Sequence, residues 1–336
     1  RSIWILDDIS PIQRAAAALS TEATLFDVRP AMTFFDAPED RPRWLGDRPF
    51  WGKNPTFGAA LSFYLGHAAK EVRLSVRDNQ NVEIADLDGE LTAGARQPGI
   101  NRVYWDLRHQ ALPFRKIPGE QRPGPTTYFA DPLPGPFVLA GDYRVTLSVD
   151  GKEVGSKTVQ VTNDRLVTIS DEDRRAWHDT ALALHLLQQS ADEAAEAVAS
   201  LSDELRAMER LAAPDRLRES SLAGTLDNVR KKLADLRVRL GVSGQGEGGE
   251  GSGAGGGSAR ARRNIRARIT STKTQIAGAM SAPTADQAAE ARAVRPELSD
   301  AITELNTLIA TDFPALVKAL AGNNAWQTVK PVRPIT

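Results

Sequence analysis

The most strongly patterned part of this chain reads Gly99-Ile100-Asn101-Arg102-Val103-Tyr104-Trp105-Asp106-Leu107-Arg108. A glycine opens the stretch as a turn, and the alternation that follows predicts a half-buried β-strand over 102–107. Val103, Trp105 and Leu107 share one face of that strand, and the residues between them share the other. A second alternating strand follows Gly141 and runs to Val149. We expect these two strands to lie at the centre of a small β-sandwich.

Further alternating segments extend the pattern over residues 58–165. The expected strands are Ala59–Leu65, Glu71–Arg77, Val82–Asp86, Arg102–Leu107, Pro136–Leu139, Tyr143–Val149 and Val154–Val161. Asp150-Gly151 between two of them predicts a tight hairpin. Short strands at this spacing are typical of an Ig-like antiparallel β-sandwich. Residues 107–136 carry seven prolines and are expected to form a long surface loop.

After Ser170 the apolar period changes from that of a strand to that of a helix. One heptad seam runs from Leu184 to Met208, and further seams follow within residues 222–240, 265–279 and 296–309. Helices with such stripes must pack on one another, so we expect an antiparallel helical bundle over residues 170–322. A Gly-rich flexible linker is expected at 241–258 and a tail at 323–336. The expected fold class is therefore α+β and multidomain.

The charge of the expected helices predicts their packing order. Residues 171–209 carry ten acidic and three basic side chains, residues 259–280 carry six basic and no acidic ones, and residues 284–322 carry six acidic and three basic ones. The basic helix is expected to pack between the two acidic helices. Binding of nucleic acid or an anionic membrane is the alternative for the basic segment. Because it lacks interleaved aromatic residues, we expect no nucleic-acid partner.

The first part of the chain is expected to be less regular. Residues 1–28 predict a short apolar strand at Ser2–Leu6 and a short helix within Gln13–Leu25. Residues 29–57 are rich in proline and aromatic residues, and we expect a connector that is pinned to a surface. The chain starts with Arg1 rather than Met, from which we expect a processed chain or an excerpt of something longer.

The composition narrows the chemistry. The chain contains no cysteine, which excludes disulfides, thiol catalysis and cysteine metal sites but does not decide the compartment. The net charge is -1, which argues against an attraction of the whole chain to polyanions. No apolar run reaches the length of about 18 residues that a transmembrane helix needs, and no signal peptide is apparent.

Four short motifs follow one another within residues 1–165. They are Ser-Ile-Trp-Ile-Leu-Asp-Asp at 2–8, Asn-Pro-Thr-Phe-Gly-Ala at 54–59, the stretch at 99–108 and Gly-Asp-Tyr at 141–143. The series resembles the C-terminal region of sortilin-type, BNR-repeat β-propeller proteins, which are secreted bacterial chains described as glycosyl hydrolase-like. Its Ig-like module is also similar to that of flagellar hook-capping proteins. The resemblance implies an upstream propeller, whose Asp-box repeats are absent here, and a secreted, periplasmic or cell-surface location.

Four residues are candidates for binding. Asp106 and Arg108 share one face of their strand and could form a polar site, although an ion pair that locks the strand is the favoured interpretation. Trp44 and Trp51, with Phe50 and Phe57, could form a platform for a carbohydrate. The favoured alternative is that these rings fasten the connector across a domain.

The remaining candidates predict no catalytic, metal or cofactor site. Neighbouring carboxylates such as Asp7 and Asp8 point to opposite faces of a strand. The acidic turn at 86–90 lacks the ligand ladder of a calcium loop, and His178 and His185 lack zinc spacing. The Gly-rich tract lacks the Gly-Lys-Ser/Thr of a phosphate loop.

Three functions stay open. The favoured one is a non-catalytic accessory module that packs on an upstream β-propeller, with the helices binding another protein or a second copy. The second is part of a glycan-active hydrolase whose active site lies in that propeller. The third is an adhesin-like module that binds a glycan or a surface.

Overall fold

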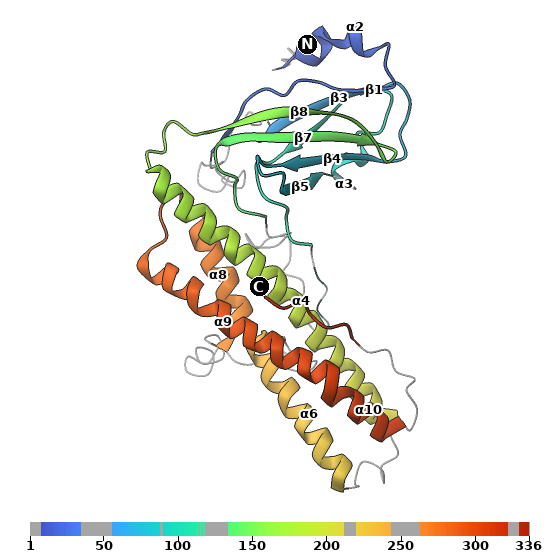
Figure 1. Ribbon diagram of the computed structural model, residues 1–336, viewed down its shortest axis with the longest axis vertical. Coiled ribbons are helices and arrows are strands. Elements are labelled where there is room, and N and C mark those ends of the chain that lie inside the picture. Colours follow the sequence, from blue (N-terminus) through green and yellow to red (C-terminus); the bar gives the residue numbers. More distant parts are fainter. Residues whose placement is uncertain are drawn as a thin grey trace, which may run out of the picture. The chain divides into compact units, whose positions relative to one another are not determined.

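The structure is a computed structural model that describes residues 8–34, 56–87, 90–113, 115, 117, 134–211, 220–242, 263–321 and 329–335. The chain divides into two compact units: unit 1 comprises Arg1–Ala111 and Pro134–Ser170, and unit 2 comprises Leu112–Leu133 and Asp171–Thr336. Strands form two sheets in unit 1, and long helices dominate unit 2 (Figure 1). The chain is therefore a mixed α+β protein.

The first sheet of unit 1 holds the strand quoted at the outset. Its order is β1 (Ala23–Leu25), β3 (Ala59–Leu65) and β6 (Gly99–Trp105), and both pairings are antiparallel. Val103 and Trp105 are buried while Arg102 and Tyr104 are half-buried, as the alternation predicts. The strand ends two residues earlier than expected, because Leu107 adopts a φ of 58° that breaks the extended backbone.

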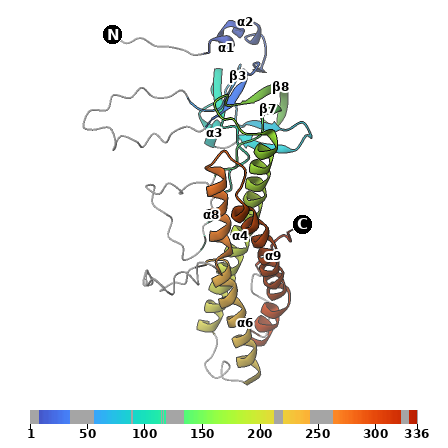
Figure 2. The same ribbon diagram turned by 90° about the vertical axis from the view of Figure 1, so that its left-hand side faces the viewer.

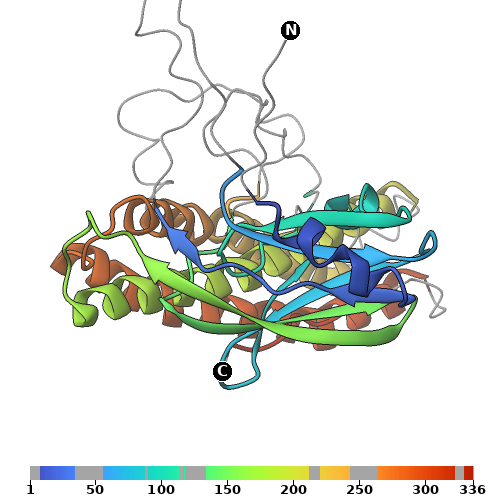
Figure 3. The same cartoon turned by 90° about the horizontal axis from the view of Figure 1, so that it is seen from above.

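The second sheet of unit 1 has the order β2 (Ala31–Thr33), β8 (Lys152–Asn163), β7 (Gly141–Val149), β4 (Val72–Arg77) and β5 (Glu83–Leu87). Figure 3 shows β7 and β8 in green along one side of the unit. The predicted hairpin between them is confirmed, since Asp150 and Gly151 have φ values of 49° and 79° and β7 pairs antiparallel with β8. Buried side chains of both sheets meet where the rings of Trp105 and Tyr143 lie 5.4 Å apart.

The predicted short helix within Gln13–Leu25 is confirmed as α2 (Ala15–Ala18), which follows α1 (Ser10–Gln13) and precedes strand β1. Two other expectations for unit 1 need correction. Strand β2 lies in the expected connector and pairs parallel with β8, so the sheets are not purely antiparallel. Residues 136–139 contribute an isolated bridge between Phe137 and Arg108 in place of a strand. In each case pairing with a distant strand decided the local structure, which a short segment does not reveal by itself. A short helix, α3 (Glu90–Ala93), was not expected.

The helices described in unit 2 are α4 (Asp171–Leu211), α6 (Ser220–Arg239), α8 (Ile265–Ala277), α9 (Ala285–Thr307), the π-helical turn η2 (Leu308–Asp312) and α10 (Phe313–Ala321). Helix α4 begins directly after Ser170, where the period was predicted to change. Every residue of its predicted seam from Leu184 to Met208 is buried, and so is the α6 seam from Leu222 to Leu240. The apolar stripes therefore form the core of unit 2.

Helix α9 begins well before the seam that predicted it. Thr284 and Gln287 form a reciprocal capping box at its start, and an Ala-rich turn follows. Pro296 lies inside the helix rather than at its beginning. The ring is exposed on the outer side of the helix, while Val294 and Leu298 on either side of it are buried. Helix propensity alone would place this proline at the start of a helix. The packing of the turns on either side of it keeps the helix continuous through Pro296.

The end of α6 shortens the expected linker. Gly241 has a φ of 67° and Val242 donates its backbone N–H to the Arg237 carbonyl at 2.8 Å, which is the arrangement of a glycine C-cap. Val242 is buried, so the linker does not begin at Gly241 as expected. Residues 243–258 of the linker, and the expected strand Ser2–Leu6, lie outside the described residues.

Among the residues that the structure describes, no helix combines the length and the apolar character that crossing a membrane requires.

Candidate functional site

Asp106 and Arg108 lie together at the end of β6, where they close a loop. The Arg108 guanidinium stands 3.5 Å from the centre of the Phe137 ring and donates from Nη1 to the Gly135 carbonyl at 3.0 Å. The Arg108 backbone N–H donates to Asp106 Oδ1 at 3.1 Å, and the indole N–H of Trp105 donates to the Arg108 carbonyl at 3.0 Å. The Asp106 side chain is exposed, but the protein atoms around its carboxylate reduce its solvation and raise its pKa, and the positive charge of Arg108 partly offsets this rise.

Two glycines allow the backbone to close around this loop. A Cβ at Gly135 would lie 2.1 Å from the His109 carbonyl oxygen, and a Cβ at Gly58 would lie 2.1 Å from that of Trp105. Gly58 also has a φ of 110°, which a side chain disfavours. Gly58 belongs to the motif at 54–59, so two of the four motifs meet here. The contacts of Asp106 and Arg108 support the structural interpretation of this pair.

Of the aromatic group in the connector, Phe57 is described. Its ring makes edge contacts with Phe34 at 4.8 Å and Phe137 at 5.7 Å, so it packs within unit 1. Trp44 and Trp51, together with Phe50, lie outside the described residues.

Arg102 holds the segment around Asp8 against strand β6. Its Nε donates to Ser62 Oγ at 3.0 Å, and its Nη2 donates to the Asp8 carbonyl at 3.1 Å and lies 3.6 Å from Asp8 Oδ2. Asp8 Oδ1 accepts from the Ser10 N–H and hydroxyl and so holds the start of α1. Burial alone would raise the pKa of Asp8. Hydrogen bonds from Ser10 and the charges of Arg102 and Arg29 outweigh it and lower that pKa.

Three apolar side chains close in sequence to Asp8 or Arg102 are exposed. Ile9 follows Asp8 directly and Ile12 lies in α1, and their exposed fractions are 49% and 57%. Ile100 shares the outer face of β6 with Arg102 and is also exposed. We call the surface formed by Ile9, Ile12, Ile100 and the Asp8–Arg102 pair the entry surface.

In unit 2, α8 contacts both α4 and α9, as the charge pattern predicts, but α4 also contacts α9 directly, so α8 does not separate the two acidic helices (Figure 2). Arg266 Nε lies 2.7 Å from Asp192 Oδ1 of α4. Arg268 donates to the carboxylates of Glu290 and Glu297 of α9 at 2.6 Å each, and these hydrogen bonds raise the pKa of Arg268. Arg266 and Arg268 of the basic segment thus form ion pairs with acidic residues of unit 2. Arg260 and Arg262 lie outside the described residues.

A buried polar seam runs between α4 and α8, and sequence reasoning did not find it. Lys273 Nζ lies 3.1 Å from His185 Nδ1, and both residues are only 3% exposed. One turn further along, Gln188 Nε2 donates to Thr270 Oγ1 at 3.2 Å, and the Asp192–Arg266 pair follows. Residues 185, 188 and 192 share one stripe of α4, which was the available signal. Their partners were not evident, because the rotation of α8 against α4 is a tertiary property.

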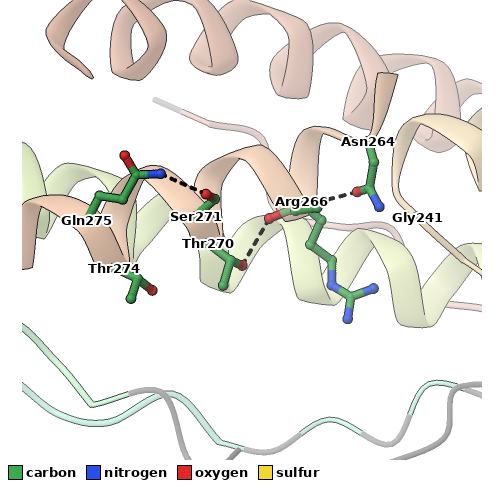
Figure 4. Close-up of a pocket in the computed structure, with 8 residues that line it drawn as sticks. Gly241, Asn264, Arg266, Thr270, Ser271, Thr274 and Gln275 are labelled. Atoms are coloured by element: carbon green, nitrogen blue, oxygen red, sulfur yellow. Dashed lines mark hydrogen bonds between the residues drawn. The ribbon is translucent and has the colours of Figure 1, made fainter. Parts of the chain in front are cut away.

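An open pocket of about 570 Å³ lies along α8 and shares Arg266 and Thr270 with the polar seam (Figure 4). Asn264 caps α8 at one end by accepting from the Ala267 N–H at 3.0 Å, and Gly241 leaves room for its side chain. The pocket is lined by the guanidinium of Arg266 and by the hydroxyl and amide groups of Thr270, Ser271, Thr274 and Gln275. The described lining holds no carboxylate, imidazole or aromatic ring, so these groups can bind a polar ligand but supply no general base.

Within the described part of the chain, no group of three potential ligand side chains is placed to hold a metal ion. His178 Nδ1 lies 2.9 Å from Asp179 Oδ1, and His185 faces Lys273.

Comparison with protein-family models, with curated proteins and with solved structures finds no match to this chain. The family resemblance therefore remains a prediction from four motifs.

Proposed function

We propose that this chain is a non-catalytic accessory module of a secreted, sortilin-like β-propeller protein, which packs on the propeller and associates with other proteins. The contact that carries the proposal is the one between Arg102 and Asp8. Asp8 closes the segment that resembles a final propeller strand, and Arg102 lies in the motif at 99–108. The contact ties the segment that would follow the propeller to the sheet of unit 1, which supports a fixed attachment of this unit to a preceding domain.

The composition of the entry surface supports a packing role. An interface typically has an apolar centre with arginine among its anchors and few other charges. Ile9, Ile12 and Ile100 supply exposed apolar area beside an arginine that is already held in place by Asp8 and Ser62. Covering these side chains with a preceding domain would remove apolar surface from water.

We also propose that the two sheets form an Ig-like β-sandwich and that the helices of unit 2 form an antiparallel bundle. Tyr143, near the start of β7, donates its hydroxyl to the Leu139 carbonyl at 2.8 Å, as the tyrosine corner of Ig-like domains does. The edge contact of its ring with Trp105 joins the two sheets in the core. The buried heptad seams of α4 and α6 support the bundle.

The polar groups of the described residues support binding rather than catalysis. Asp106 and Arg108 hold a loop, the charges of α8 pair with neighbouring helices, and the described lining of the α8 pocket has no acid–base group. In the alternative of a glycan-active hydrolase, the acidic residues belong to the upstream propeller. The two functions therefore differ in whether the whole protein is an enzyme. In neither of them do residues of this chain carry out catalysis.

Association with the upstream domain tests the proposal. The region that precedes this chain in its reading frame is produced separately, and its binding to residues 1–336 is measured by calorimetry. We expect binding that Arg102→Met weakens at least tenfold. Arg77→Met is the matched control, because Arg77 pairs with Glu83 at the surface of the other sheet. An upstream region without Asp-box repeats, or equal binding by both variants, would contradict the proposal.

An activity assay separates the alternatives. Residues 1–336 alone are expected to leave glycan and peptide substrates intact. Hydrolysis by this chain alone would overturn the accessory role. Hydrolysis that appears only when the upstream region is present would instead support the hydrolase alternative.

A further inference from the structure

Asn306 of α9 holds an extended segment from the far end of the chain. Its Nδ2 donates to the Val332 carbonyl at 2.8 Å, and its Oδ1 accepts from the Val332 N–H at 2.9 Å. One side-chain amide thus satisfies both backbone groups of one residue. This is the pattern by which a protein binds an extended peptide through its main chain, whatever its side chains.

The side chain of Val332 supplies an anchor in the same place. It is 6% exposed, whereas its neighbours Pro331 and Arg333 are exposed. The segment therefore buries one branched aliphatic side chain against unit 2, while the residues on either side of it in the chain stay exposed. A pocket for one side chain combined with main-chain hydrogen bonds is the usual arrangement of a peptide site.

A groove of about 380 Å³ continues beside this anchor. It is lined by Ile302, Thr303 and Thr307 of α9, by Thr311 of η2 and by Pro334 and Ile335 of the segment. Pro334 and Ile335 of the segment thus form part of its wall. We call it the α9–η2 groove.

The helix changes its winding where the groove lies. Directly after Thr307, η2 forms a π-helical turn, and the Phe313 N–H bonds to the Leu308 carbonyl. Such turns are rare and frequently occur at functional sites. Lys232 of α6 holds the end of this turn by an ion pair to Asp312 at 2.5 Å. The unusual winding is thus anchored within unit 2 beside the peptide-like segment.

We propose that the α9–η2 groove is a binding site for extended peptides of another polypeptide that carry a branched aliphatic residue two positions before proline. Segment 329–335, with Val332 and Pro334, occupies this site in cis and competes with such a peptide. The site uses the amide of Asn306 for the main chain and the Val332 pocket for the side chain. It is separate from the entry surface, and its failure would leave the proposed packing role untouched.

Peptide binding tests the site. A chain that ends at residue 328 is mixed with a labelled peptide of the sequence Val-Lys-Pro-Val-Arg-Pro-Ile-Thr, and binding is followed by fluorescence anisotropy. We expect this chain to bind at least tenfold more tightly than the full chain, in which the site is filled. Asp in place of the fourth peptide residue, or Asn306→Ala in the shortened chain, is expected to abolish binding. A shortened chain that keeps its helical circular dichroism but binds no peptide would overturn the proposal.

A second measurement does not depend on the shortened chain. In the full chain, we expect the Val332 amide to be protected from hydrogen exchange and Asn306→Ala to accelerate its exchange at least tenfold. Asn306→Asp, which keeps an acceptor but loses the donor, is expected to fall between them. The matched control Asp300→Ala, at an exposed residue of α9 outside the lining of the groove, should leave the Val332 amide protected. Unprotected exchange of this amide in the unaltered chain would also overturn the proposal.

Sedimentation distinguishes a segment of the same chain from a segment of a second copy in the groove. A dimer that the peptide dissociates would place a second copy's segment in the same groove.

Discussion

Trp105 contacts several separate parts of the core of unit 1. Its ring contacts Tyr143 of the other sheet, its indole N–H bonds the Arg108 carbonyl, and its own carbonyl faces Gly58 at a distance that excludes a side chain. The ring is fully buried. A substitution at any of these neighbours therefore acts on the same core, which makes Gly58 and Tyr143 informative positions.

Gly58→Ala is expected to destabilise unit 1 because of the close approach to Trp105. The new methyl group would lie 2.1 Å from the Trp105 carbonyl oxygen, and the backbone has a φ of 110°. We expect a loss of about 3 kcal/mol in the free energy of unfolding, measured with urea. Gly99→Ala is the control, since Gly99 has a φ of 108° but nothing within 4 Å of a Cβ. If both variants lose the same free energy, the backbone conformation and not the contact with Trp105 is responsible.

Tyr143 makes the stability of unit 1 depend on alkaline pH. Burial, with a contribution from the charge of Asp78, raises the pKa of Tyr143 to about 12. In the unfolded chain the phenol ionises near pH 10. The stabilisation by the neutral phenol is therefore complete below about pH 10 and is lost as the pH rises through about 12.

Tyr143→Phe is expected to remove this pH dependence. Over that range we expect the unaltered chain to lose about 2 kcal/mol more of its free energy of unfolding than the variant does. Urea unfolding at both ends of the range measures the difference. Tyr104→Phe is the control, because Tyr104 lies half-buried on the outer face of β6. The same slope in Tyr143→Phe and the unaltered chain would show that another group titrates.

At the scale of the elements, α8 is held by charge on one side and by the polar seam on the other. Arg268→Met removes the hydrogen bonds to Glu290 and Glu297 and leaves two carboxylates of α9 without this partner. We expect a loss of about 2 kcal/mol in the stability of unit 2. Arg263→Met, at an exposed pair with Asp235, is expected to cost no more than about 0.5 kcal/mol.

Urea unfolding followed by helical circular dichroism checks both variants. The Arg268 side chain is 21% exposed, so raised salt should weaken its contribution less than it weakens exposed pairs. Equal effects of the two variants would mean that the pairs of α8 act only as a diffuse charge field.

The elements that the sequence predicts best are those whose pattern is long enough to state which face is buried. Strands β3, β4 and β7 and the seams of α4 and α6 are examples, because alternation or heptad spacing depends on local geometry. Strands β1 and β2 have three residues each, and they form by pairing with β3 and β8. A segment of that length carries no period, so its structure is fixed by a partner far away in the chain.

The candidate sites divide in the same way. Asp106 and Arg108 are close in sequence, so their shared role at one strand end was predictable. His185 and Lys273, or Asn306 and Val332, come from different segments. Their contacts depend on the rotation and register of helices, which no local pattern contains.

At the scale of the whole molecule, the chain passes between the two units more than once. Residues 112–133 belong to unit 2, while the residues on both sides of them belong to unit 1. Arg115, within this insertion, bonds Glu193 at 2.8 Å and Glu196 at 2.7 Å on α4. Unit 2 is thus built from two separate parts of the chain.

This arrangement predicts that substitutions of Glu193 and Glu196 in α4 change the stability of unit 2 in the full chain but not in a fragment that lacks Arg115. In a fragment of residues 171–336, Glu193 and Glu196 have no Arg115 to bond. We expect Glu193→Gln together with Glu196→Gln to destabilise unit 2 of the full chain by about 1 kcal/mol and to leave the fragment unchanged. Arg115→Met should reproduce the effect in the full chain and add nothing to the double variant. Urea unfolding followed by helical circular dichroism measures each case, with Asp203→Asn, whose partner Arg206 is in both proteins, as the control. An equal loss in fragment and full chain would mean that the two glutamates act within α4 and that the insertion contributes no stability to unit 2.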